Sequence, residues 1–384
     1  MKRNIGLSIA APLLAIGVAM LVSAFMLTIT GYSAGDVFHV IVTQGFSKAY
    51  LVDTLNRAAP YYIAGVAVAI AFKMNLFYIG VEGAYRLAAL MGAAVGAAVT
   101  LPPLLHIPLI LAVSMITGAA WAFIPAILKT WRGVSEVISS IMLNAISLGL
   151  SAFLLGRWLR QPIGEGSPVV GTRPIAASGR LPTLNSLMNS VGLDIPDAIR
   201  VQSYLVIAAL VGVIFYLIVW RSRFGYDLRA SGANADAAVA SGVNAKRMII
   251  TAMLLSGAAA GLIGLNNILG TGERFTDVTV VRGLGFTGIA IALLGRNNPI
   301  GIAFAALLWA FMDAVQAPLS NADLPKQITG IMQGITVLSV VIAYEVVRRI
   351  GARRQASDLR RATVEPGSAA PPSTGGAGPE VAPA

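Results

Sequence analysis

Long apolar runs separated by short polar stretches make up most of this chain. Eight runs come close to the ~20 residues that a helix needs to cross a bilayer, and they lie at 5–30, 51–72, 83–101, 104–128, 134–156, 201–220, 247–269 and 327–347. Two more, at 283–295 and 300–318, are shorter or interrupted by glycine. The pattern predicts an all-α fold: a polytopic integral membrane helical bundle with about ten hydrophobic segments, some broken or re-entrant.

Composition indicates the same fold class. Hydrophobic residues make up 56% of the chain and charged residues only 12%, against about 25% charged in a soluble domain. The net charge of +11 comes from Lys and Arg concentrated at the ends of the apolar runs, which favours contact with anionic membrane lipid over nucleic acid. There is no cysteine, and His39 and His106 are isolated, so we expect no metal site and no nucleic-acid partner.

The basic residues also predict the orientation of the runs. If Lys2 and Arg3 lie in the cytoplasm, the alternation of spans places the other basic clusters there too, as the positive-inside rule requires. Those clusters are Lys129 with Arg132, the stretch 221–247, Arg296, and the arginines between 348 and 354. The prediction is a transmembrane domain at 1–349 with an external loop at 157–200, and a disordered tail at 350–384, with both termini cytoplasmic.

The polar island at 221–247 has the local signals of a helix. Asn234 is a good N-cap, Asp236 adds a negative charge to the first turn, and the alanines that follow favour helix until Gly242 ends it. The island therefore predicts one short helix held between two membrane spans. From these residues alone, a loop that only fixes topology remains an equal alternative.

Polar residues also interrupt the apolar pattern at 72–83. Gly80 and Gly83 break this stretch, and irregular backbone at membrane depth is tolerated only where protein or a water-filled path surrounds it. Glu82 and Arg86 are four residues apart and are expected to pair on one helical face. The candidate translocation-path residues are Asn75, Tyr78, Glu82, Arg86, Asn144 and Phe286. A purely structural Glu–Arg clamp, and helix-to-helix hydrogen bonding by Asn144, are the alternatives.

Glycines elsewhere predict close packing rather than nucleotide chemistry. Gly283, Gly285 and Gly288 match G-x-G-x-x-G, but no predicted strand precedes them, so we interpret them as a bent or tightly packed half-helix. Glycine pairs at helix-packing spacing are Gly92 with Gly96 and Gly257 with Gly261. The chain has no G-x-x-x-x-G-K-[ST] phosphate loop and no nucleophile–base constellation, so we predict that it is not an enzyme.

Four stretches of the chain resemble one known family. They are FYIGVEGA at 77–84, GVSEVISSIMLN at 133–144, the region from RASGANADAAVASGVN to LSGAAAGLIG at 229–264, and GLGFTGIAIALLGRNNPIG at 283–301. Together they resemble the permease subunits of ATP-binding-cassette importers for sugars, nucleosides and branched-chain amino acids, over most of 50–345. Tyr78 and Ala84 depart from the family's Phe-Asn-Ile-Gly-Val-Glu-Gly-Gln stretch.

The resemblance implies a half-channel in a bacterial cell membrane. Its partners would be a second permease subunit, identical or homologous, a cytoplasmic ATPase that holds the ATP and Mg, and an extracytoplasmic substrate-binding protein. No cofactor is expected in this chain. The implied contact with the ATPase is the helix region around Arg229, Gly232, Asn234, Ala237 and Gly242.

The choice of substrate depends on the branch of the family. The stretch at 133–144 and the long external loop favour the nucleoside branch, with ribose-like sugars and branched-chain amino acids as alternatives. An ion-coupled secondary transporter is the alternative of another class, and it would bind its coupling ion at intramembrane acids such as Glu82 and Asp313. A membrane scaffold that transports nothing is the third possibility.

Overall fold

The computed structural model describes residues 5–161, 170–190, 196, 199–272, 274–277, 279–322, 327–339, 342 and 349. Its α-helices are α1 (Ile5–Ile29), α2 (Ala34–Gly45), α3 (Lys48–Lys73), α4 (Val81–Ala98), α5 (Pro103–Arg132), α6 (Glu136–Leu154), α7 (Asn185–Ser190), α8 (Tyr204–Tyr216), α9 (Arg223–Ala233), α10 (Ala235–Ala240), α11 (Ala245–Ile263), α12 (Leu265–Asn267), α13 (Leu284–Leu294), α14 (Pro299–Ala314) and α15 (Gln316–Asn321). Short π-helical turns follow α6, α8 and α12 at Leu155–Leu159, Leu217–Arg221 and Ile268–Gly272, and Ala177–Gly179 form a 3-10 turn. Residues 327–339 are also helical.

The prediction of an all-α membrane bundle is confirmed. Each of the ten apolar runs coincides with helix in the described part of the chain, and the described residues form no strand beyond isolated bridges. Among the described residues, six helices are long and apolar enough to cross a bilayer: Lys48–Lys73, Pro103–Arg132, Glu136–Leu159, Tyr204–Arg221, Ala245–Gly270 and Pro299–Asn321. The predicted tail at 350–384 and much of the predicted external loop, at 162–169, 191–195 and 197–198, lie outside the described residues.

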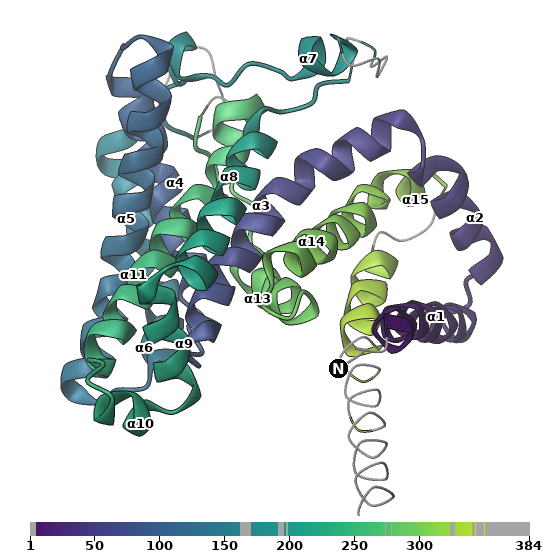
Figure 1. Ribbon diagram of the computed structural model, residues 1–384. Coiled ribbons are helices and arrows are strands. Elements are labelled where there is room, and N and C mark those ends of the chain that lie inside the picture. The colour runs from purple at the N-terminus through teal and green to yellow at the C-terminus, as the bar shows by residue number, and fades with distance from the viewer. Residues whose placement is uncertain are drawn as a thin grey trace, which may run out of the picture.

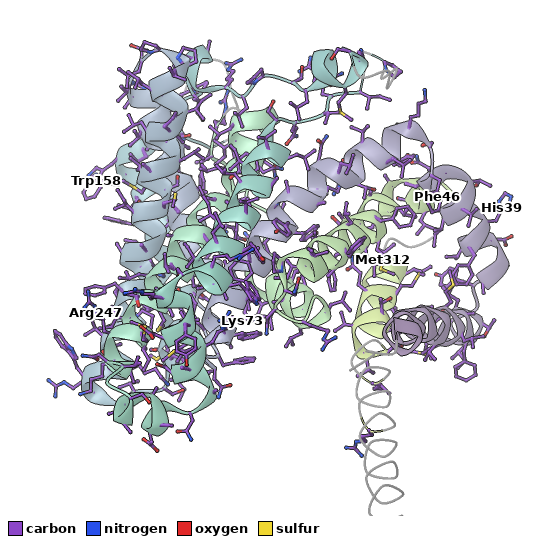
Figure 2. The ribbon with its side chains drawn as sticks, viewed as in Figure 1. His39, Phe46, Lys73, Trp158, Arg247 and Met312 are labelled. Atoms are coloured by element: carbon purple, nitrogen blue, oxygen red, sulfur yellow. The ribbon has the colours of Figure 1, made fainter. Side chains whose placement is uncertain are left out.

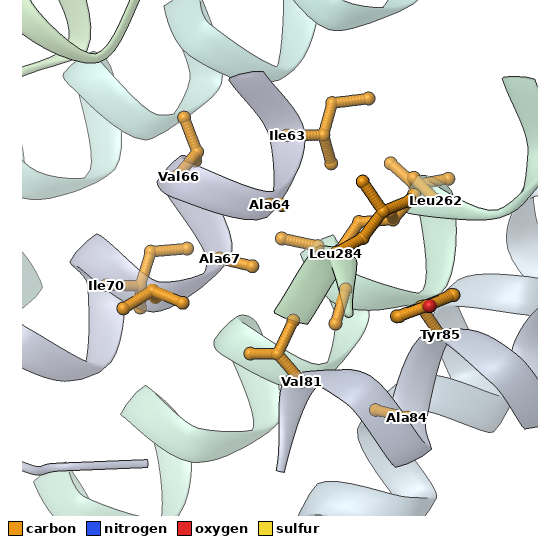
Figure 3. Close-up of a cluster of buried hydrophobic side chains, with 14 of the residues drawn as sticks. Ile63, Ala64, Val66, Ala67, Ile70, Val81, Ala84, Tyr85, Leu262 and Leu284 are labelled. Carbon is orange, nitrogen blue, oxygen red and sulfur yellow. The ribbon is translucent and has the colours of Figure 1, made fainter. Parts of the chain in front are cut away.

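Helix α3 is the central element of the fold. It crosses between α4, α5 and α11 on one side and α13 and α14 on the other (Figure 1), and it contacts α8, α11, α13 and α14. Figure 3 shows Ile63, Ala64, Val66 and Ala67 of α3 in the buried cluster that Leu284 of α13 also joins. Small side chains allow this close approach, which matters because van der Waals packing is a main source of helix association in lipid.

Glycine brings α5 and α11 into direct backbone contact. A Cβ atom on Gly118 would collide with the carbonyl group of Gly257 and lie 3.0 Å from the backbone nitrogen of Gly261. Gly257 and Gly261 are one of the two predicted pairs. The other pair, Gly92 and Gly96, faces Ser114 and Ile110 of α5 at similarly short range. The prediction that these glycines mark close helix packing is confirmed.

Helices α1, α2 and α15 form a separate unit with residues 327–339, away from the main bundle (Figure 1). A small buried cluster holds this unit together and contains Leu27, Val37, Val315, Leu319, Ile328 and Met332. Phe46, labelled in Figure 2, packs its ring at a tilt against that of Phe311, with ring centroids 5.1 Å apart, and ties the unit to the end of α14.

Candidate functional site

The chain is broken between α3 and α4, where the sequence predicts an interruption. Residues 74–80, called the broken segment below, form no α-helix, and Asn75 has a φ of +57°. Backbone N–H and C=O groups in such a segment have lost their helical partners and must be hydrogen-bonded by other groups when they lie within a membrane. The groups that hydrogen-bond to its backbone therefore hold the broken segment in place.

Helix α6 supplies several of those partners from one face. The Phe77 N–H donates to Oε1 of Glu136 and the Ile79 N–H to Oγ of Ser140, each over 3.3 Å. Glu136 also forms an ion pair with Lys129 at the end of α5. Glu136 and Ser140 are one helical turn apart and both are buried. Side chains one turn apart on α6 therefore bind N–H groups two residues apart in the broken segment.

Asn144 continues the same face one turn further along α6. Its Oδ1 accepts a hydrogen bond from the Gly83 N–H over 2.8 Å, and its Nδ2 donates to the Ile79 carbonyl over 3.1 Å. Of the two interpretations of Asn144, a path residue or a hydrogen-bonding link between helices, these bonds match the second. Both ends of its amide are used by backbone groups.

Glu82 connects α4 to the beginning of α13. Its carboxylate accepts hydrogen bonds from the Gly283 N–H (2.8 Å), the Gly285 N–H (2.9 Å) and the Tyr85 hydroxyl (3.0 Å). Gly283 has a φ of +86°, and a Cβ on Gly285 would lie 2.9 Å from Cα of Glu82. The first N–H groups of a helix lack partners and favour a negative charge, so Glu82 caps α13. The expected tightly packed half-helix is confirmed.

Arg86 does not pair with Glu82, so that expectation is wrong. In the described part of the chain, the guanidinium group forms an ion pair with Asp277 and donates from Nε to Oγ of Ser151 over 3.1 Å. Burial opposes ionisation of Asp277, but Arg282 and Arg86 outweigh it and lower the pKa of this loop carboxyl group. The two residues share a helical face, yet each reaches a partner on another element, because α13 and its preceding loop pass directly alongside α4.

The other candidate path residues point in different directions. Tyr78 is buried, and its hydroxyl has no hydrogen-bond partner among the described residues. Asn75 is exposed beside the end of α3, and Phe286 is 52% exposed on the outside of α13. Asn75 and Tyr78 thus belong to the broken segment itself, and Asn144 binds it through the Ile79 carbonyl. Glu82 and Arg86 bind other elements, and Phe286 lies apart from all of them on the exposed side of α13.

The polar island forms two helices rather than the single predicted one. Oδ1 of Asn234 accepts from the Ala237 N–H over 3.0 Å and caps α10, and Gly242 has a φ of +86° where the chain turns into α11. Helix α9 precedes α10, although the sequence prediction missed it because Gly225 and Gly232 lower its helix propensity. The N-cap signal was present in Ser222, whose Oγ accepts from the Gly225 N–H over 2.9 Å.

Helix α9 packs directly on the beginning of the broken segment. A Cβ on Gly232 would collide with the Lys73 carbonyl oxygen and lie 2.9 Å from Cα of Met74. Lys73, labelled in Figure 2, places its ammonium group 4.8 Å from the ring centroid of Trp220. Arg229 donates to the Val219 carbonyl over 2.8 Å. The pair of helices is thus fixed to the same end of α3, while Asn234 and Ala237 of α10 remain exposed.

A polar cavity of about 420 Å³ lies near the opposite end of α3. Asp313 of α14 borders it and accepts hydrogen bonds from Arg57 (3.0 Å) and from the Tyr61 hydroxyl (3.1 Å). Arg57 also pairs with Asp53 one turn earlier on α3. The four-residue spacing of Asp53 and Arg57 was a signal in the sequence, but their proximity to Asp313 depends on the fold.

Comparison with known proteins gives a consistent family assignment. Residues 50–341 match the family described as the permease component of branched-chain amino acid transport systems. The guanosine ABC transporter permease protein NupP of Bacillus subtilis is 34% identical over 338 residues, which cover 87% of this chain and 93% of that protein. The nucleoside ABC transporter permease protein NupB of Lactococcus lactis is 31% identical, covering 88% and 91%. The glucose ABC transporter permease protein TsgB13 of Haloferax volcanii is also 31% identical, covering 87% of each.

Proposed function

Because this chain belongs to the family of permease components of branched-chain amino acid transport systems, we propose that it is the membrane subunit of an ATP-driven importer of nucleosides. The observation that carries the substrate class is the similarity, over nearly the whole chain, to permeases named for guanosine and for nucleosides. Import of a simple sugar is the second candidate, since a glucose permease is nearly as similar.

In this proposal, ATP hydrolysis takes place in a separate subunit. A cytoplasmic ATPase that holds ATP and Mg binds the exposed face of α10, near Asn234 and Ala237. The contact of Gly232 with Lys73 and Met74 supports this role, because backbone groups in van der Waals contact cannot move independently. A displacement of α9 is therefore passed to α3 and to the broken segment.

The hydrogen bonds of Glu82 and Asn144 determine which helices move when the broken segment is displaced. Glu82 binds the start of α13, and Asn144 binds the segment to α6. Helices α3, α6 and α13 are then expected to shift as packed bodies between two arrangements, rather than bend gradually. Alternating access of this kind needs a second permease subunit, identical or homologous, and an external binding protein that delivers the substrate. Both chain termini lie in the cytoplasm in this arrangement.

The test is transport by the complete system. The chain is co-expressed with the ATPase, the second permease and the binding protein, and uptake of radiolabelled guanosine into proteoliposomes is measured with and without ATP. Unlabelled guanosine, glucose and leucine serve as competitors. The proposal requires uptake that depends on ATP and is inhibited by guanosine. ATP-dependent uptake of radiolabelled glucose in the same proteoliposomes, without uptake of guanosine, would establish the sugar alternative, whereas uptake driven by an ion gradient without ATP would overturn the importer mechanism.

A further inference from the structure

An open apolar groove runs along the outside of the bundle between α8 and α14, over the first half of α3. All three helices belong to candidate membrane spans, and both α8 and α14 contact α3 (Figure 1). The groove has a volume of about 760 Å³ and is larger than the cavity beside Asp313. Its wall includes Val213, Ile300 and Phe304, which are 55%, 69% and 70% exposed. An exposed apolar surface of this kind marks contact with lipid or with another protein.

The shape and lining of the groove suit an extended hydrocarbon chain. Along α8 it runs from Leu205 to Trp220, which is about 22 Å at a rise of about 1.5 Å per residue. One leaflet contributes about 15 Å, half of the ~30 Å hydrocarbon core, so an acyl chain fits lengthwise. The side chains in the wall that carry a polar atom are Tyr62, Tyr216, Trp220 and Asn298. All but Tyr62 lie where α8 ends and α14 begins, so the groove has one polar end.

A cation without an acidic partner lies at that polar end. The Lys73 ammonium group is 4.8 Å from the ring centroid of Trp220. Among the described residues no carboxylate pairs with this ammonium group, and the charge that acts on it is that of another cation, Arg229. Arg221, which follows Trp220, is exposed. Figure 2 shows Lys73 at the same end of the bundle as Arg247, which is the predicted cytoplasmic side. The polar end of the groove therefore attracts an anion.

We propose that the groove binds an anionic phospholipid of the cytoplasmic leaflet, with an acyl chain along α8 and α14 and the phosphate beside Lys73. Basic pockets between membrane helices on the cytoplasmic side bind anionic headgroups, and a tryptophan such as Trp220 is typical of the membrane interface. The apolar face of a helix from a second permease would cover the same wall, but it brings no negative charge to Lys73, and a cation left in hydrocarbon is costly. A phospholipid matches both parts of the surface.

The bound lipid would lie beside the packed end of α3. Arg229 of α9 donates to the Val219 carbonyl, directly before Trp220, and Gly232 packs against Lys73. A phospholipid held at Trp220 and Lys73 therefore touches the elements through which α9 contacts α3. Such binding does not depend on which solute the importer carries.

The test is a lipid titration of the full-length chain, purified in detergent with the partners that remain bound. Dioleoylphosphatidylglycerol is anionic, dioleoylphosphatidylcholine has the same chains without net charge, and native mass spectrometry measures the affinity for each. Wild type should bind the anionic lipid about fivefold more tightly, the effect of one cation near the membrane surface. Lys73→Gln should abolish that preference and leave the affinity for phosphatidylcholine unchanged, whereas Lys73→Arg should keep the preference.

Matched controls separate the groove from the rest of the surface. Lys246→Gln removes an exposed charge from the beginning of α11 and should keep the wild-type preference. Ala209→Phe fills the groove and should weaken binding of both lipids to the same extent. Leu210→Phe changes the exposed neighbour, which is not part of the wall, and should weaken neither.

Three results would overturn the proposal. The first is equal affinity of wild type for the two lipids, or equal effects of Lys73→Gln and Lys246→Gln. The second is loss of affinity for both lipids in Lys73→Gln, which would mean that the lysine only supports the fold. The third is a lower yield of the complex with a second permease in Ala209→Phe, with lipid binding unchanged, which would show that a protein covers the groove instead.

Discussion

The two ends of α3 differ in how their polar groups are satisfied. At the Lys73 end, backbone packs on backbone through Gly232, and α6 hydrogen-bonds the broken segment that follows. At the Asp53 end, the ion pairs of Arg57 with Asp53 and Asp313 border a polar cavity of about 420 Å³. The first arrangement suits the transmission of a displacement, and the second suits the binding of a small molecule. The two ends should therefore fail in different ways when altered.

The largest effect is expected at Gly232. Gly232→Val places branched carbon atoms where the Lys73 carbonyl and Met74 already lie, and overpacking of this kind costs about 1–3 kcal/mol. We expect ATP-dependent uptake to fall by about tenfold or more, while ATP hydrolysis continues. The number of substrate molecules imported per ATP hydrolysed, measured in proteoliposomes, is the readout.

The neighbouring residue provides the control for Gly232. Ala233 is exposed, so Ala233→Val adds similar bulk to α9 without entering the contact, and it should keep the wild-type ratio. Equal ratios for wild type and Gly232→Val, in complexes of equal yield, would show that the packed end of α3 has no part in coupling.

Glu82 tests whether the clamp on α13 is electrostatic. A glutamine at this position keeps one side-chain oxygen, so one of the N–H groups of Gly283 and Gly285 loses its acceptor. Glu82→Gln should destabilise the detergent-solubilised protein by about 1.5–3 kcal/mol, the range for hydrogen bonds to a charged group, as measured by thermal unfolding. Asp236→Asn, which neutralises an exposed carboxylate in the first turn of α10, should cost less, about 0.3–1 kcal/mol. A stable Glu82→Gln protein would contradict the clamp.

Asp313 should affect the other end of α3. Asp313→Asn removes the charge that binds Arg57 and weakens the bond from Tyr61, which loosens the wall of the cavity. Uptake at low guanosine concentration should fall about threefold, while the ratio of import to ATP hydrolysis stays at the wild-type value. A change in that ratio without a change in concentration dependence would mean that the two ends of α3 are not functionally distinct.

The sequence predicted those structural features that depend only on residues close together in the chain. The cap at Asn234, the turn at Gly242 and the break before α4 all follow from residues within a few positions. Partners distant in the chain could not be predicted in the same way. Glu82 was a conspicuous intramembrane acid, but the N–H groups that it binds lie about 200 residues later, at Gly283 and Gly285.

The polar face of α6 is an intermediate case. Glu136, Ser140 and Asn144 recur at four-residue spacing, which indicates a shared face, although the sequence does not say what that face binds. The cavity could not be found from the sequence at all. Asn266 and Gln202 are far apart in the chain, and only the packing of α12 beside residues 200–202 places both residues in the wall of one cavity.

The smallest effect is expected at Gly242, outside both ends of α3. Its φ is +86°, and no atom lies within 4 Å of the place that a Cβ would take. Gly242→Ala therefore meets no steric obstacle except the left-handed backbone, which costs about 1–2 kcal/mol. The strain falls on the turn between α10 and α11, so ATPase association should weaken by a few-fold while the concentration dependence of guanosine uptake stays at the wild-type value. Gly330→Ala, a helical glycine with equally open surroundings and no positive φ, is the matched control and should alter neither. A change in that concentration dependence in Gly242→Ala would show that the turn acts on the cavity as well, and the separation between the two ends of α3 would no longer hold.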